Sequence, residues 1–307
     1  MKILYIDRGS VTNSNYTYQY YGDFYRELQK KADVTLYQSY IESVNLQNYD
    51  CVIFGLGFFA QTHKDAYTYF ENIANANIPV VCMIHKLMTL VPEKLNFCKI
   101  NNIDLLLHPH ITYKDDAKSI DGETIRFWFG ADPEIYYPRD IAKIYDIGFS
   151  GTAHGGDKIP GPTNDLRNRV HGKLLKNNYS LFWNIENRIP VEEYATKMCS
   201  CKMWVSTTGP VLDVSPRYFE VMLSKTLLLC NNMPYEYEGV FKDGINCVTF
   251  ANDLSDLEEK VEYYLNNDEE RKKIIDNAYD MAISNYTWSA ITDNVLNKIR
   301  EIKHDRV

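Results

Sequence analysis

The residues best suited to chemistry lie in one apolar stretch, SPRYFEVMLSKTLLLCN (215–231). Ser215, followed by a proline, is typical of a helix start and predicts a helix over 216–224. Arg217 and Glu220 fall three residues apart on one side of this helix. One interpretation is a solvated ion pair; the other is that Arg217 and the helix N-terminus attract an anion while Glu220 accepts hydrogen bonds from hydroxyl groups. The apolar strands on both sides favour the second, and a phosphate joined to a ribose fits it.

A second candidate is the glycine-rich segment GFSGTAHGGD (148–157), which follows an apolar strand. Its small residues, among them Gly151 and Thr152, allow a ligand to approach the backbone, whose N–H groups suit phosphate oxygens. His154 lies in the same segment and could reach a phosphate. The segment lacks the Gly-Lys-Ser/Thr of a Walker loop, and an ordinary glycine-rich loop is the alternative.

Two polar residues end predicted strands of the first half, where a general base could lie. They are Asp7, after KILYI, and His85, after IPVVCMI. The sequence GLGFFA (55–60) has the spacing of a dinucleotide fingerprint, but it follows the third strand, and the next strand ends in His and Lys instead of an acid. We therefore interpret it as a strand-to-helix turn.

A metal site is not expected. His108 and His110 could form half of one, but we find no cluster of acids or cysteines beside them in the sequence, and no Asp-x-Asp motif.

The scaffold for these residues is predicted by apolar runs that alternate with helical stretches. Such a pattern indicates parallel sheets covered by helices on both faces. Two long helices are expected at the end, over 255–285 and 288–303. The predicted strands are 2–7, 33–38, 50–57, 78–85, 103–108, 123–129, 145–151, 179–183, 202–207, 226–231 and 246–250.

The alternation pauses at GADPEIYYPRD (130–140) and then restarts, which predicts an α/β chain with two Rossmann-like doubly wound domains. We expect an N-terminal domain over 1–138, a second domain over 139–286, and a C-terminal helix over 287–307 that returns to the first domain. Ligands of open α/β sheets bind beyond the carboxyl ends of the strands. Two such domains facing across a cleft favour an enzyme with two substrates.

Composition limits the partners. The 307 residues carry a net charge of −8 with a pI near 5.4, which argues against nucleic acid or an anionic membrane as the partner. Seven cysteines without a C-x-x-C pair indicate buried reduced thiols. With no apolar run long enough for a transmembrane segment and no signal peptide, we expect a cytoplasmic protein.

From YDIGFSGT through SPRYFEVMLSKTLLLCN and FKDGINCVTF to SNYTW, the second half resembles the C-terminal domain of glycosyltransferases with the GT-B fold. The likeness is strongest to the group that includes the spore-maturation CgeB-like proteins, within the glycosyl transferases group 1 type of domain. GADPEIYYP also resembles the interdomain link of these enzymes, and IPVVCMIH resembles the strand that ends in His in retaining relatives.

The resemblance implies a metal-independent hexosyltransferase-type enzyme. It would move a sugar from a UDP- or GDP-linked donor, bound by the second domain, to a hydroxyl of a glycan, lipid-linked or other acceptor at the first. Glu220 would hold the ribose hydroxyls, while Arg217 and the Gly151–Thr152 loop would lie near the diphosphate. Ser215, Tyr218 and His154 complete the predicted donor site. No cofactor is implied beyond the nucleotide-sugar co-substrate.

Two departures from the family pattern leave questions open. Many retaining relatives carry a Glu eight residues before the position of Glu220, where this chain has Leu212 followed by Asp213, so both retaining and inverting chemistry remain open. Inverting chemistry would need Asp7 or His85 as the general base, whereas in retaining chemistry His85 would position the sugar. Lys225 replaces a small residue and could form a salt bridge or contact a phosphate. The alternatives are a non-catalytic nucleotide-sugar-binding protein of the same fold and a nicotinamide-dependent oxidoreductase.

Overall fold

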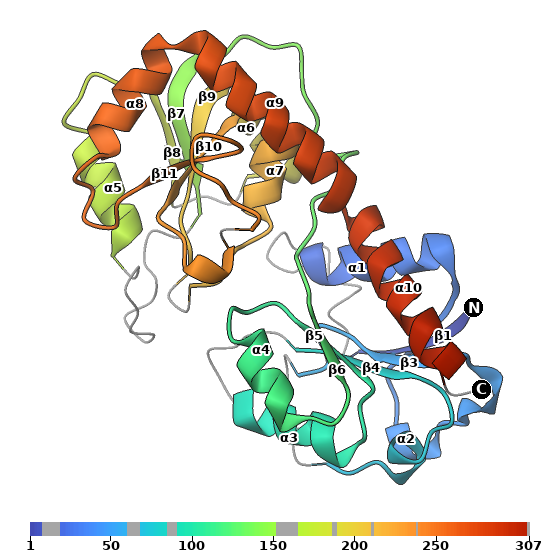
Figure 1. The fold of residues 1–307 in the computed structure, drawn as a ribbon. Coiled ribbons are helices and arrows are strands. Elements are labelled where there is room, and N and C mark those ends of the chain that lie inside the picture. Colours follow the sequence, from blue (N-terminus) through green and yellow to red (C-terminus); the bar gives the residue numbers. More distant parts are fainter. Residues whose placement is uncertain are drawn as a thin grey trace. The chain divides into compact units, whose positions relative to one another are not determined.

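The chain divides into two compact α/β units. The computed structural model describes residues 1–7, 19–59, 68–84, 91–151, 165–185, 189–209, 212–237 and 239–305. The first unit comprises Met1–Phe129 and Trp288–Val307, and the second comprises Gly130–Thr287. Figure 1 shows the ribbon of both units.

The first unit is built on a six-stranded sheet in the order β2-β1-β3-β4-β5-β6, in which all neighbours are parallel. Its central strands are short and completely buried, as expected for strands covered on both faces. The sequence predicted all six, each within a few residues of the observed ends. The strands are β1 (Lys2–Ile6), β2 (Asp33–Tyr37), β3 (Cys51–Phe54), β4 (Val80–Met83), β5 (Leu105–His108) and β6 (Glu123–Arg126).

Helices cover both faces of this sheet. Alternate side chains of its strands pack on α1 (Gln19–Lys31) and α10 (Trp288–Asp305) on one face, and on α2 (Glu71–Ala74) and α3 (Val91–Ile100) on the other. The division follows from the two-residue period of a strand, which sends neighbouring side chains to opposite faces. Shorter helical segments are α4 (Tyr113–Asp116) and the 3₁₀ turns Ile41–Ser43, Leu46–Asn48 and Ala117–Ser119.

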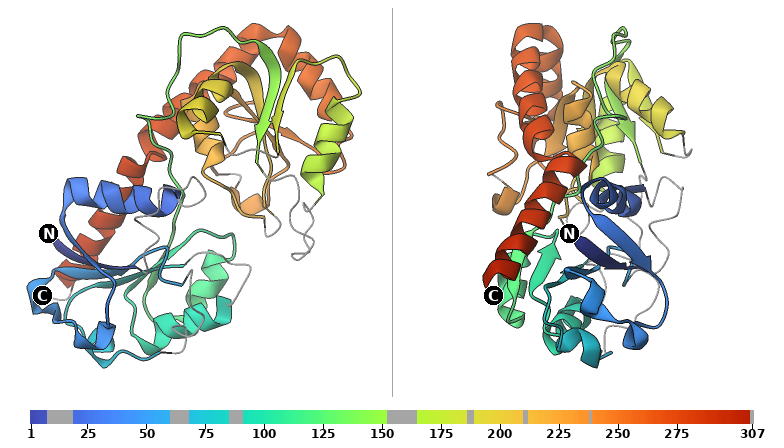
Figure 2. Two further views of the ribbon diagram at one scale, coloured as in Figure 1. Left: turned by 180° about the vertical axis from the view of Figure 1, so that it is seen from behind. Right: turned by 90° about the vertical axis from the view of Figure 1, so that its right-hand side faces the viewer.

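The last helix, α10, belongs to the first unit, which confirms the expectation that it returns there. It packs against α1, as Figures 1 and 2 show from different sides. Ion pairs fix its position at both sides, from Lys31 to Asp293 at 2.7 Å and from Lys298 to Glu123 at 2.6 Å. The second half of the chain therefore supplies part of the first unit's core.

The second unit contains a five-stranded parallel sheet in the order β11-β10-β9-β7-β8. Numbered from its own first strand, this is the order 2-1-3-4-5, which the first five strands of the other sheet also have. The strands are β7 (Tyr145–Ser150), β8 (Leu181–Asn184), β9 (Cys201–Ser206), β10 (Leu227–Asn231) and β11 (Val248–Phe250).

Helices again cover both faces of the sheet. One face packs on α5 (Leu166–Leu174), α8 (Leu257–Asn266) and α9 (Asp268–Asn285). The other two helices contact the strands as well: α6 (Val191–Cys199) contacts β7 and β9, and α7 (Arg217–Leu223) contacts β9 and β10. The single helix predicted over 255–285 is two helices, because Asn267 leaves the helical conformation with φ −121° and ψ 75°. A 3₁₀ turn, Tyr235–Tyr237, precedes β11.

The segment that follows Phe129 belongs to the second unit and not, as the sequence suggested, to the end of the first. Ala131 forms a parallel bridge with Thr287, its N–H donating to the carbonyl of Tyr286 at 3.0 Å. Arg139 donates to Glu192 at 2.9 Å. These contacts tie the segment to elements of the second unit along its length.

No helix within the described ranges is both long and apolar enough to cross a membrane.

Candidate functional site

The strand order of each sheet marks one position for a ligand. Where the first strand lies between the second and third, successive connections leave toward opposite faces and open a crevice beyond the carboxyl ends. In the second unit this position lies between β7, which ends at Ser150, and β9, which ends at Ser206.

Gly151 and Arg217, both predicted from the sequence to contact a donor, are brought together at this position. Gly151 has φ +148°, which L side chains rarely adopt, and its N–H donates to the carbonyl of Asn184 at 3.0 Å. A Cβ placed on it would lie 3.1 Å from Nη2 of Arg217. The guanidinium therefore lies directly against the backbone at the end of β7.

Arg217 and Glu220 are linked through a tyrosine of the neighbouring helix. Nε of Arg217 donates to the hydroxyl of Tyr194 at 3.0 Å, and that hydroxyl donates to Oε2 of Glu220 at 3.2 Å. Glu220 is 8% exposed. A carboxylate accepts several hydrogen bonds, so this orientation is compatible with additional hydroxyl donors. Tyr194 lies in α6, and no sequence pattern connected it with the other two.

A second arginine, Arg167, lies at the same place and was missed by sequence reasoning. It lies in the first turn of α5, and its Nε donates to Oγ1 of Thr207, directly after β9, at 2.9 Å. The guanidinium carbons of Arg167 and Arg217 are each 6.0 Å from the ring centroid of Phe149, which is completely buried. A basic residue in the first turn after the glycine-rich segment was the signal that could have found it.

The two guanidinium groups influence each other. Burial and then the charge of Arg217 lower the pKa of Arg167 to about 10. Like charges in a partly buried site favour the binding of an anion, and guanidinium groups match the oxygens of phosphate in geometry.

Ser215 does not cap the helix as predicted. The helix begins at Arg217, and the carbonyls of Ser215 and Pro216 accept the first N–H groups of the turn, from Tyr218 at 3.2 Å and Phe219 at 2.9 Å. Because the backbone takes these donors, the Ser215 hydroxyl has no capping role; it is buried without a hydrogen-bond partner among the described residues.

Tyr218 is part of the core. It is completely buried, its ring packs edge-on against Phe241 at 5.2 Å, and its hydroxyl donates to the carbonyl of Ser206 at 3.3 Å. Because its ring and its hydroxyl are both engaged within the core, we do not propose Tyr218 as a ligand contact.

The position where relatives carry a further Glu is part of a tight turn. Leu212 has φ +62°, and its carbonyl accepts a hydrogen bond from the Tyr237 hydroxyl at 2.9 Å. The next residue, Asp213, places its carboxylate against the backbone of Gly209, where a Cβ would collide with it. Asp213 thus supplies a carboxylate one residue after the position at which relatives carry the Glu.

Lys225 forms a salt bridge, one of the two roles left open by the sequence. Its Nζ donates to Oδ1 of Asp276 at 2.8 Å and lies 4.9 Å from the ring centroid of Tyr279. Both partners lie in α9, so this side chain joins α7 to α9.

In the first unit, Asp7 lies at the corresponding position between β1 and β3. It is completely buried, and its Oδ2 accepts the N–H of Gly57 at 2.9 Å. Gly55 is in contact with the ring of Tyr5, which occupies the space that a Cβ would need. The GLGFFA turn is thus filled by the protein's own side chains, which supports the interpretation as a plain turn and argues against dinucleotide binding there.

Three predicted site residues, His85, Thr152 and His154, lie outside the described residues, and their roles stay predictions. His108 and His110 are described, and an acid does lie beside them: Nε2 of His108 is 2.8 Å from Oδ2 of Asp116, which the sequence reasoning overlooked. Within the described ranges, no group of three or more His, Cys, Asp or Glu side chains could hold a metal ion.

Comparison with protein families agrees with this picture for the second half. Residues 158–297 match the family described as Glycosyl transferase-like. The predicted resemblance is therefore confirmed for this part of the chain. No curated protein shows significant similarity to the sequence.

Solved structures share the fold over nearly the whole chain. HepE from Anabaena in complex with UDP-glucose is 14% identical with a TM-score of 0.61, covering 98% of this chain and 100% of HepE. Sucrose-phosphate synthase from Thermosynechococcus elongatus is 10% identical with a TM-score of 0.67, covering 98% and 99%. β-Glucosyltransferase of T4 phage is 13% identical with a TM-score of 0.59, covering 97% and 99%. The two Rossmann-like units therefore form a GT-B-like fold.

Proposed function

We propose that this protein is a glycosyltransferase that moves a sugar from a nucleoside-diphosphate sugar to an acceptor hydroxyl without an essential metal. One observation carries the proposal: Arg167 and Arg217 lie over the same buried ring, Phe149, beside the backbone turn at Gly151. A diphosphate is the ligand that such a pair of guanidinium groups next to a glycine backbone would accept.

The chemistry needs the negative charge on the leaving diphosphate to be stabilised. As the bond between the anomeric carbon and the phosphate oxygen breaks, charge accumulates on the diphosphate, and Arg167 and Arg217 would neutralise it in the role that a metal plays elsewhere. The acceptor oxygen bonds to the anomeric carbon and gives up its proton to a general base or to the departing diphosphate. Glu220, oriented by Tyr194, would accept hydrogen bonds from the ribose hydroxyls.

UDP is the nucleotide we propose first, with GDP as the other candidate. HepE is described in complex with UDP-glucose, and the DNA-modifying β-glucosyltransferase, 14% identical with a TM-score of 0.59, takes uridine diphosphoglucose as its substrate. These likenesses support a UDP-hexose donor. The hexosyl specificity and the cytoplasmic location are parts of the same proposal, and the net charge of −8 argues against a DNA acceptor.

The proposal is tested by thermal shift and calorimetry with UDP, GDP and ADP. We expect UDP to raise the melting temperature and Glu220→Ala to weaken UDP binding by about tenfold or more, equivalent to about 1.4 kcal/mol. Glu259→Ala, which removes an exposed glutamate of the same unit, serves as the matched control. Equal UDP affinity of wild type and Glu220→Ala would show that the site assignment is wrong.

A non-catalytic nucleotide-sugar-binding protein is the second candidate, and one observation favours it. The carboxylate of Asp7, a predicted general base, is buried and bound to the N–H of Gly57. Donor hydrolysis distinguishes the two candidates: a protein that binds UDP-glucose tightly but releases no UDP with any acceptor offered is the binder. His85 then remains to be tested as the base or the sugar-positioning group, by His85→Gln in the same assay.

A further inference from the structure

A second cluster of polar side chains lies at the carboxyl edge of the first unit's sheet, away from Asp7. β5 and β6 are neighbours whose last residues, His108 and Arg126, are partners in the strand register. The segments that follow these strands contribute His110, Thr112 and Tyr113 after β5 and Trp128 after β6. The carboxyl edge of an open α/β sheet is where ligands bind.

His108 is the most constrained residue of this cluster. It is completely buried, and its Nε2 is bonded to Oδ2 of Asp116 at 2.8 Å while its Nδ1 accepts the N–H of His110 at 3.1 Å. Burial, opposed by Asp116 and assisted by His110 and Arg126, lowers the pKa of His108 to about 4. The ring is therefore neutral near pH 7, and it holds the backbone of His110 in place.

The side chain of His110 is oriented by the turn that follows. The N–H of Thr112 donates to Nδ1 of His110 at 3.3 Å, and the Thr112 hydroxyl donates to Asp116 at 2.5 Å. The Thr112 hydroxyl oxygen also lies 3.0 Å from Nδ1 of His110. The turn thus fixes the orientation of the His110 ring at the sheet edge through its Nδ1.

Arg126 lies over two aromatic rings. Its guanidinium carbon lies 4.6 Å from the ring centroid of Trp128 and 5.4 Å from that of Tyr113. Rings over the faces of a guanidinium stabilise its charge and fix its plane, and hydrogen bonding then proceeds through the edge. A purely structural stacking role is the alternative that the experiment must separate from a ligand role.

We propose that Arg126 and His110 form a binding site for a phosphate monoester carried by the acceptor. Arg126 is the register partner of His108 on the neighbouring strand, and the ring of the same His108 accepts the N–H of His110, so one group with several oxygens can meet both. A phosphate offers three acceptor oxygens, and a guanidinium with a fixed plane binds two of them in parallel. The acceptor would then be a phosphorylated sugar or polyol. This inference rests on the proposed function, since it names the acceptor class of that enzyme.

The first experiment measures binding to the full chain with UDP at saturation, so that the proposed diphosphate site is filled. The probes are glucose 6-phosphate and glycerol 3-phosphate, each compared with its unphosphorylated parent by calorimetry. We expect each phosphate ester to bind about tenfold or more tightly than its parent, the size of effect that a charge-assisted bidentate contact gives. Equal binding of ester and parent would overturn the inference.

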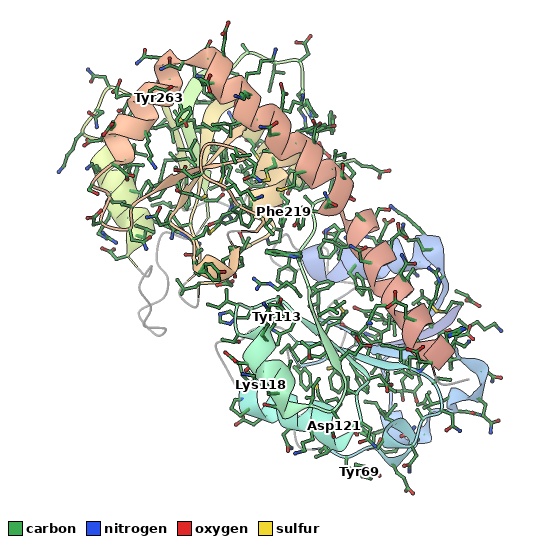
Figure 3. All side chains as sticks on the ribbon, viewed as in Figure 1. Tyr69, Tyr113, Lys118, Asp121, Phe219 and Tyr263 are labelled. Carbon is green, nitrogen blue, oxygen red and sulfur yellow. The ribbon has the colours of Figure 1, made fainter. Side chains whose placement is uncertain are left out.

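Variants separate a ligand role from stacking. We expect Arg126→Gln to lose the preference for the esters and Arg126→Lys to keep part of it. In His110→Gln, we expect the affinity for the esters to fall about threefold to tenfold. The matched control is Lys118→Gln, which removes one exposed positive charge just beyond α4. Figure 3 labels Lys118 and, at the start of the same helical stretch, Tyr113. Folding of each variant is checked by its circular dichroism and melting temperature.

The two proposals fail in distinguishable ways. If UDP binds but Arg126→Gln, correctly folded, binds the esters as the wild type does, the acceptor inference is wrong and the donor proposal stands. If no nucleotide binds, the donor proposal fails, and the esters are then titrated without UDP in Arg217→Ala, which disables the other anion site. An ester preference that depends on Arg126 in that variant still supports the phosphate site, and its absence overturns the site.

Discussion

The two sheets share one strand order but use the same topological position differently. In the first unit the position between β1 and β3 is closed by the protein itself, through the bond from Gly57 to Asp7 and the ring of Tyr5 against Gly55. In the second unit the position between β7 and β9 has the guanidinium of Arg217 against Gly151, with Arg167 close by.

Topology therefore locates a crevice, and the side chains around it determine what can bind there. A glycine serves both positions, but Gly55 makes room for a neighbouring aromatic ring whereas Gly151 allows a cationic side chain to lie on the backbone. In the first unit, polar groups gather instead at the ends of β5 and β6. The two proposed anion sites thus lie at different strands of the same fold.

The largest expected effect contrasts the two positions directly. Arg217→Ala should weaken UDP binding on the order of 100-fold, because truncating a partly buried charged contact costs about 2–5 kcal/mol. Asp7→Ala should leave UDP affinity within about twofold and lower the free energy of unfolding by about 1–3 kcal/mol, since the N–H of Gly57 loses its acceptor. Calorimetry and urea unfolding measure the two. A large loss of UDP affinity in Asp7→Ala would contradict the inference that the two positions differ in nucleotide binding.

Gly55→Ala should affect only stability. The added methyl group would collide with the buried ring of Tyr5, and overpacking of this kind costs about 1–3 kcal/mol of unfolding free energy. Gly172→Ala is the control: this helical glycine has no neighbour within 4 Å of an added Cβ, so its replacement should be neutral or stabilise by up to about 1 kcal/mol. If both variants had the same stability, the close packing inferred at Gly55 would be wrong.

Tyr194→Phe tests whether the tyrosine hydroxyl positions Arg217 and Glu220 for the nucleotide in the second unit. It removes the hydroxyl that links Arg217 to Glu220 and keeps the ring that packs on Trp204. We expect UDP affinity to fall about fivefold to tenfold, the worth of about 1 kcal/mol of hydrogen bonding, with a smaller change in melting temperature. An unchanged UDP affinity would mean that the link does not position either group for a ligand.

The smallest effect is expected at Lys225. Its left-handed backbone, φ +47°, favours glycine, while its ion pair with Asp276 is partly exposed and contributes little. Lys225→Gly should therefore change the free energy of unfolding by less than about 1 kcal/mol and leave UDP affinity unchanged. Weaker UDP binding in this variant would indicate that Lys225 contacts a phosphate of the nucleotide.

Much of the architecture was predictable because short apolar runs separated by helical stretches specify parallel strands by local pattern alone. The positions of all eleven strands in the described part of the chain were predicted within a few residues, and so was the return of α10 to the first unit. The break at Asn267 was missed because helical periodicity continues on both sides of it. The predicted capping role of Ser215 was also wrong. The backbone carbonyls of the turn accept the hydrogen bonds from the N–H groups that its hydroxyl was expected to bind.

Local residue patterns were enough to predict the fold class, the resemblance to glycosyltransferases, and the placement of Arg217 and Glu220 on one side of a helix, since each depends on residues close together in the chain. The side chains that meet these two residues depend on the tertiary structure. Tyr194 and Arg167 reach the site from two other helices, and Arg126 meets Tyr113 and Trp128 at a strand end. Such contacts arise because parallel strands bring their carboxyl ends to one edge, whatever the distance between them in sequence.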